Sequence, residues 1–110
     1  MEKSLNIAVP IEKRKVSYDV EHCNMFVRYE IDRANNQIVN VCILDAPPPS
    51  ICDRVLWLSE RCVHMLLYCG INPIINELCM KRGIKVISGF HPDNPKQAIY
   101  CFLKNQSKTM

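Results

Sequence analysis

Two of the histidines and three of the cysteines in this sequence are candidate metal ligands. His22 and Cys23 are adjacent in the segment "EHCN", and Cys52, Cys69 and His91 follow further along the chain. Imidazole nitrogens and thiolates are ligands that soft transition metals and iron–sulfur clusters prefer. None of the cysteines forms a CxxC pair or a zinc-finger spacing, so each also has a purely structural interpretation. Which residues meet depends on the elements that carry them.

The hydrophobic pattern predicts five strands and one long polar loop. Residues 25–31 alternate between polar and apolar side chains, which is typical of a strand. Residues 63–69 are apolar almost throughout, as expected in the middle of a sheet that is covered on both faces. The other strands are predicted over residues 5–11, 37–44 and 84–88, and the polar loop over 12–24.

Three helices are predicted from their start signals. Ser50 follows three prolines and has Asp53 three residues on, which is typical of a helix start. Asn72 and Asn94 each precede a proline, and this pair combines a capping side chain with a residue suited to the first helical turn. The helices are expected from Ser50 to about residue 61, from 73 to Gly83, and over 95–104, with 105–110 as a frayed tail.

The order of these elements predicts a three-layer α/β domain with a mixed sheet. The two crossovers after residues 37–44 make the later strands parallel, and residues 25–31 form the antiparallel strand. Ligands of such sheets bind at the carboxyl ends of the parallel strands, beside helix N-termini. This topology sends His22, Cys23, Cys69 and His91 to one rim, with Cys52 as a further candidate.

Length and composition restrict the class of protein. With 110 residues, 48% of them hydrophobic, the chain 1–110 is expected to form one domain with its core over about 5–104. The net charge of +3 is mild and the basic cluster 13–15 is short, so no nucleic-acid partner is predicted. No segment has membrane-spanning length or signal-peptide form, so a cytoplasmic location is expected. The seven cysteines, an odd number, are then expected to be reduced.

Catalytic motifs give no support to an enzyme. The sequence has no GxSxG, HExxH, P-loop or GxGxxG motif. Nuclease chemistry with two magnesium ions needs carboxylates on the first strand, and residues 7–11 contain none. A cysteine–histidine nucleophile pair can be drawn at the rim, but no third group orients it. We therefore predict a protein without catalytic activity.

Five segments have a recognisable order and spacing. They are "NIAVPI" at 6–11, "EHCNMF" at 21–26, "QIVNVCIL" at 37–44, "YCGINP" at 68–73 and "RGIKVISG" at 82–89. In these segments, and over about residues 5–103, the chain resembles the dinitrogenase iron–molybdenum cofactor biosynthesis family, which includes NifX-like proteins and the C-terminal part of NifB-type proteins.

The resemblance implies a ribonuclease-H-like α/β/α fold with sheet order 3-2-1-4-5 and an antiparallel second strand. It also implies a carrier of iron–sulfur or iron–molybdenum clusters that has a donor or acceptor protein as its partner. His22 matches the histidine of the family, whereas Cys23 replaces a phenylalanine. Gly70 and Ile71 match the family's Gly-Gly-Ile-Gly turn, in which Cys69 and Asn72 replace the outer glycines.

These expectations combine into one leading interpretation. His22, Cys23 and Cys69 would be the metal ligands, with His91 as a fourth. The helix starts at Asn72 and Asn94, together with Gly70 and Ile71, would provide backbone N–H groups to an anionic cluster.

Two other interpretations stay open. The first is a regulatory module that binds a protein or an anionic metabolite without a metal, in which case the cysteines only pack. The second is a thiol redox protein that uses Cys23 or Cys69. We expect a monomer or a weak homodimer, since the strand at 37–44 could be an exposed edge.

Overall fold

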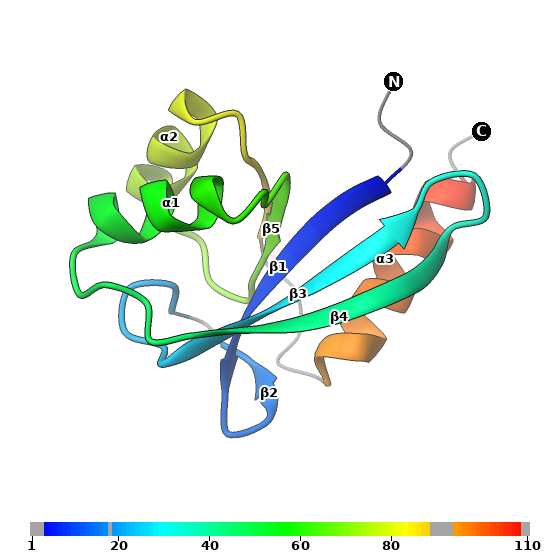
Figure 1. Ribbon diagram of the computed structural model, residues 1–110, viewed down its shortest axis with the longest axis horizontal. Coiled ribbons are helices and arrows are strands. Elements are labelled where there is room, and N and C mark those ends of the chain that lie inside the picture. Colours follow the sequence, from blue (N-terminus) through cyan, green and yellow to red (C-terminus); the bar gives the residue numbers. More distant parts are fainter. Residues whose placement is uncertain (1–3, 18, 89–93, 109–110) are drawn as a thin grey trace.

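A six-stranded mixed sheet forms the centre of the protein (Figure 1). The structure is a computed structural model that describes residues 4–17, 19–88 and 94–108. The main path of the sheet runs β4-β3-β1-β5-β6; β3 is antiparallel to both of its neighbours, and β1, β5 and β6 are parallel. The strands are β1 (Ser4–Glu12), β2 (Lys15–Val16), β3 (Met25–Asp32), β4 (Gln37–Asp45), β5 (Met65–Leu67) and β6 (Lys85–Ile87).

The strand β2 was not predicted. It pairs antiparallel with the end of β1, so that Ile11 lies opposite Val16, inside the segment expected to be a polar loop. Burial of Val16 explains why these residues take an extended conformation. The prediction of five strands was therefore wrong in count, and the strand order differs because β2 stands beside β1.

Three helices connect and cover the strands. They are α1 (Ile51–Glu60), α2 (Pro73–Lys81) and α3 (Pro95–Lys108). Ser50 and Asn72 cap the first two helices as predicted, with side chains that accept backbone N–H groups of the first turn. The third helix continues to Lys108, beyond the end expected at residue 104. In the part of the chain that the structure describes, no helix has the length and apolarity needed to cross a membrane.

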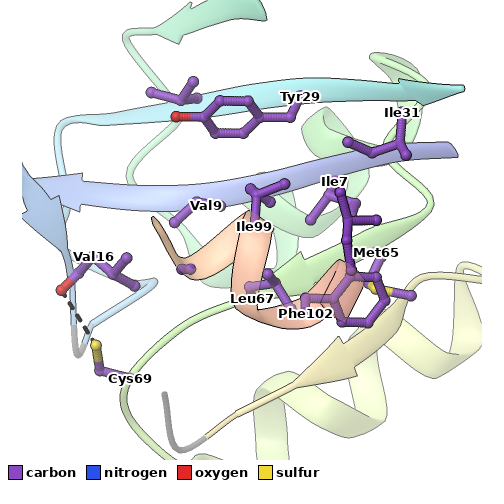
Figure 2. Close-up of a cluster of buried hydrophobic side chains, with 13 residues drawn as sticks. Ile7, Val9, Val16, Tyr29, Ile31, Met65, Leu67, Cys69, Ile99 and Phe102 are labelled. Atoms are coloured by element: carbon purple, nitrogen blue, oxygen red, sulfur yellow. Dashed lines mark hydrogen bonds between the residues drawn. The ribbon is translucent and has the colours of Figure 1, made fainter. Parts of the chain in front are cut away.

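Two hydrophobic cores lie on the two faces of the sheet. The alternation in β3 divides them as predicted: Phe26 faces the core under α1 and α2, and Tyr29 faces the core under α3. Figure 2 shows the α3-side core, in which Ile99 and Phe102 of α3 lie against the side chains of the central strands. The two cores with the sheet between them make the three layers that the element order predicted (Figure 1).

Candidate functional site

A hollow of about 700 Å³ lies at the carboxyl end of β1. Its walls are the turn between β1 and β2 and the segment that leads into β3. The lining includes Glu12, Lys13, Arg14, Asp19, His22 and Cys23. The hollow thus occupies the rim at which the sequence predicted a ligand, and two of the predicted site residues line it.

Lys13 and Arg14 form the turn at one wall of the hollow. The strand register leaves only these two residues between Glu12 and Lys15, and both have positive φ values of 53° and 69°. Two-residue hairpin turns of this kind normally use Asn-Gly, because a side chain in the left-handed region costs about 1–2 kcal/mol. A basic pair therefore occupies a turn for which it is conformationally unsuited.

Asp19 organises the opposite wall. One carboxylate oxygen accepts the backbone N–H of Glu21 at 2.8 Å, and the other contacts His22 Nδ1 at 2.5 Å. Partial burial raises the pKa of Asp19, but the hydrogen bonds from His22 and Glu21 outweigh it, so the pKa is lowered. The His22 side chain is 80% exposed. A carboxylate on Nδ1 orients the ring and directs ligand binding to Nε2.

Cys23 is buried beneath this wall. Its Sγ lies 3.7 Å from the carbonyl oxygen of Val20 and 3.6 Å from Nη1 of Arg54. Burial raises the pKa of this thiol to about 11, although the nearby Arg54 acts in the opposite direction. The thiol is therefore protonated at neutral pH and packs in the core rather than presenting a thiolate to a metal.

Arg54 of α1 fastens the wall from below. It is only 6% exposed, and its Nη1 donates to the carbonyl oxygens of Val20 and Cys23, both at 2.8 Å. Its Nε donates to the carbonyl oxygen of Pro48 at 2.7 Å. One buried guanidinium thus links the segment that carries His22 to the segment that leads into α1.

Cys69 lies in the other core. It belongs to the α3-side cluster, and its Sγ contacts the carbonyl oxygen of Val16 at 3.3 Å (Figure 2). Burial raises its pKa. Cys23 belongs to the cluster under α1 and α2, so the sheet separates the two thiols that the sequence placed at one rim. The topology placed the segments that carry these cysteines at one rim, but it did not specify the face of the sheet to which each side chain points.

The predicted ligand set is not assembled by the part of the chain that the structure describes. Across residues 4–17, 19–88 and 94–108, no three histidine, cysteine, aspartate or glutamate side chains are grouped so that they could hold a metal ion. Cys52 is exposed on α1 and lines a separate hollow with Lys81 and Arg82. His91 lies outside the described residues.

The predicted N–H donors at the helix starts already have partners. Asn72 Oδ1 accepts the N–H groups of Ile74 and Ile75, and Asn94 Oδ1 accepts that of Lys96. Asn72 also donates from Nδ2 to the Glu21 carboxylate at 3.3 Å, which ties α2 to the loop of the hollow.

The two residues before Asn72 are not lining residues of the hollow. Ile71 is exposed and Gly70 is half-buried. We therefore assign the region from Gly70 to Asn72 a supporting position beside the hollow rather than a contact with its contents.

Sequence reasoning missed four residues of this site: Lys13, Arg14, Asp19 and Arg54. The basic cluster at 13–15 was interpreted as part of a polar loop. Two-residue turns are normally recognised by glycine or asparagine, and this segment contains neither. The spacing of Asp19 and His22, three residues apart, could have indicated an oriented histidine. Arg54 had no signal except its position among the apolar residues of α1.

The architecture defines a three-layer α/β protein with a rim hollow, and known structures share its fold. No protein-family model matches the chain, and no curated protein matches it. The structure of the protein PH0822 has a TM-score of 0.82 and 21% identity, and covers 92% of this chain and 90% of that one.

Two further solved structures carry descriptive names. The apo form of the orange protein from Desulfovibrio gigas has a TM-score of 0.73 at 21% identity, with 92% of this chain and 88% of that chain covered. A protein provisionally described as a dinitrogenase from Methanocaldococcus jannaschii has a TM-score of 0.71 at 17% identity, with 96% and 92% covered. At these identities the similarity establishes the shared fold.

Proposed function

We propose that this chain is a non-catalytic binding or carrier protein that holds an anionic metallocluster in the rim hollow and delivers it to an acceptor protein. The cargo class is the iron–sulfur or iron–molybdenum type that the sequence resemblance implies. The fold shared with the orange protein and with the provisional dinitrogenase supports this class. The proposal includes membership of the dinitrogenase iron–molybdenum cofactor biosynthesis family, with its ribonuclease-H-like fold.

The strained turn at Lys13 and Arg14 carries the proposal. Backbone strain persists where the position of a side chain matters more than stability, and it concentrates at ligand sites. Here the strained conformation places two cations on the wall of the hollow. An anionic cargo would gain from this pair, because charge-assisted hydrogen bonds are about twice as strong as neutral ones. Glu12 and Asp19 also line the hollow, so the cargo would have to contact the side formed by Lys13 and Arg14.

The donor set determines how the cargo would be held. Coordination by several thiolates does not fit, because the Cys23 and Cys69 thiols are buried and lie on opposite faces of the sheet. The proposal is therefore non-covalent capture by Lys13 and Arg14, with the exposed His22 as a side chain at the hollow that could bind a metal directly.

The same cations favour an alternative, in which the ligand is an anionic metabolite without a metal. The thiol redox interpretation has less support, since a thiol with a raised pKa is a poor nucleophile at neutral pH.

The test is iron, molybdenum and acid-labile sulfide analysis of protein purified and reconstituted without oxygen. We expect metal and sulfide in the wild type and at least a tenfold loss, by the charge argument above, in Lys13→Gln/Arg14→Gln. The matched control is Lys81→Gln/Arg82→Gln, which removes another adjacent basic pair and should keep the cargo.

The cysteine variants separate the two ways of holding a cluster. Cys23→Ser and Cys69→Ser should keep the metal and sulfide, and loss in either folded variant would overturn non-covalent capture. Absence of metal and sulfide after anaerobic reconstitution would refute the cluster as cargo. Binding of inorganic phosphate that depends on Lys13 and Arg14 would then support the metabolite alternative.

A further inference from the structure

The α3-side face of β4 carries an exposed apolar strip. Val41 and Ile43 alternate along the strand on this face and are 50% and 56% exposed, and Val39, which is 57% exposed, is the unpaired residue of a bulge next to them. Val41 pairs with Tyr29 in the sheet register, and directly paired side chains share a face, so this strip continues the α3-side core. We call these three residues, together with the half-exposed Tyr100 of α3, the β4 ledge.

The ledge exists because one helix cannot cover this face. A helix is about 10–12 Å across, whereas neighbouring strands are about 4.8 Å apart, so α3 covers roughly two strands. Its buried residues pack on the central strands, and β4 is the last strand of the main path on its side. Burial, and then the nearby Tyr100, raise the pKa of Tyr29, which places Tyr100 at the border of the ledge.

We propose that a second copy of this chain covers the β4 ledge. The step between the uncovered strip and the top of α3 is one helix deep, about 10 Å, which equals the spacing of two packed sheets. Two copies related by a two-fold axis along the strands can therefore lay ledge on ledge. Each α3 then flanks the outer edge of the other copy's β4, which covers that edge as well.

The charges around the ledge agree with this arrangement. Residues 37–44 contain no charged side chain, so the apolar strips meet without like-charge repulsion. Asp45 follows at the rim end of β4, two residues after Ile43 and on the same face. Lys96 lies at the rim end of α3, one helical turn before Tyr100 on the same side of the helix. The two-fold arrangement brings Lys96 of one copy toward Asp45 of the other.

The test is sedimentation equilibrium of the full chain from micromolar to millimolar concentration. We expect a dimer with an affinity in the micromolar range or weaker, because a ledge one strand wide is at the low end of interface sizes. Val41→Asp should raise the dissociation constant at least about tenfold. Met80→Asp, which changes an apolar residue that is 76% exposed elsewhere, should leave it unchanged.

Charge reversal provides a second variant set that does not touch the core. Asp45→Lys should weaken the dimer several-fold, and adding Lys96→Asp should restore it, because the opposite charges are then exchanged. A chain that stays monomeric up to millimolar concentration overturns the proposal. So does a dimer that is insensitive to Val41→Asp, or one that Met80→Asp weakens equally.

Discussion

The turns of the β1–β2 and β3–β4 hairpins differ in how well their residues suit a positive φ. The β3–β4 turn uses residues suited to it: Asn36 takes the positive φ of 53°, and the Asp32 carboxylate accepts the N–H of Ala34 at 2.9 Å. The β1–β2 turn uses Lys13 and Arg14, both with positive φ. The β3–β4 turn lies away from the rim hollow, whereas the β1–β2 turn forms one of its walls. Of these two hairpin turns, the one that borders the hollow has the residues less suited to its backbone conformation, although Ala46 and Cys62 also take positive φ away from the hollow.

The surroundings of the two turns differ in the same sense. The Asp32–Asn36 turn is stabilised by its own side chains and backbone, including the N–H of Asn36 on the Asp32 carbonyl oxygen at 2.7 Å. The wall that faces Lys13 and Arg14 depends instead on distant groups, above all the buried Arg54. A site assembled from several segments is sensitive to substitutions far from it in sequence.

The largest expected effect is therefore that of Arg54→Met. Methionine fills a similar volume but leaves the carbonyl oxygens of Val20, Cys23 and Pro48 without their donor. Buried acceptors that lose their partner each cost about 1–3 kcal/mol, so we expect the free energy of unfolding to fall by roughly 3 kcal/mol. Urea denaturation measures it. Arg33→Met, in the exposed β3–β4 turn, is the control and should change stability by less than about 0.5 kcal/mol.

The next effect is a loss of stability at alkaline pH that originates beneath the hollow. The pKa of the Cys23 thiol is about 11 in the folded protein and 9.0 in its ordinary state. Because the pKa is raised in the folded protein, the contribution of the protonated Cys23 thiol to the free energy of unfolding is fully present below pH 9.0. It is lost as the pH rises through about 11. Two pKa units correspond to about 2.7 kcal/mol.

Cys23→Ala isolates this contribution. Its free energy of unfolding should fall less steeply between these pH values than that of the wild type, in denaturant titrations at matched ionic strength. The buried Cys79, whose pKa is also raised to about 11, should keep part of the slope. Cys101→Ala, at an exposed position, should retain the wild-type slope. An unchanged slope in Cys23→Ala would show that the thiol is not desolvated in the folded protein.

Replacing the basic turn by a relaxed one should produce a gain in stability. Lys13→Asn/Arg14→Gly supplies the residues that a two-residue turn prefers, and should raise the free energy of unfolding by about 2 kcal/mol. Thermal and urea denaturation would measure the gain, and cargo content in the same samples should fall. A variant that is not stabilised would contradict the interpretation of the turn as strained.

Sequence reasoning predicted the elements well because their signals are local. The alternation of β3 and the caps Ser50 and Asn72 each depend on residues close in the chain. The strand β2 escaped because two residues are too few to show a period, and its pairing depends on the conformation of Lys13 and Arg14.

The candidate site was predicted less well because it depends on the face to which each side chain points. The topology placed His22 and Cys23 at the rim of the sheet, and both line the hollow there. Which core receives Cys23 and which receives Cys69 is decided by strand and loop geometry that topology leaves open. The hydrogen bonds of Arg54 join segments about thirty residues apart, and no local pattern reports such a contact.

The smallest effect tests the other hairpin, where the residues already suit the turn. Asn36→Lys places a lysine at positive φ, as in the β1–β2 turn, and should lower the free energy of unfolding by about 1 kcal/mol. Asn36→Gly should change it little, because glycine tolerates this conformation. Urea denaturation of both variants, together with Lys13→Asn/Arg14→Gly, compares placing a basic residue at positive φ with removing basic residues from positive φ. If Asn36→Lys were neutral, positive φ would carry no strain in these turns, and the strain argument for the hollow would fail with it.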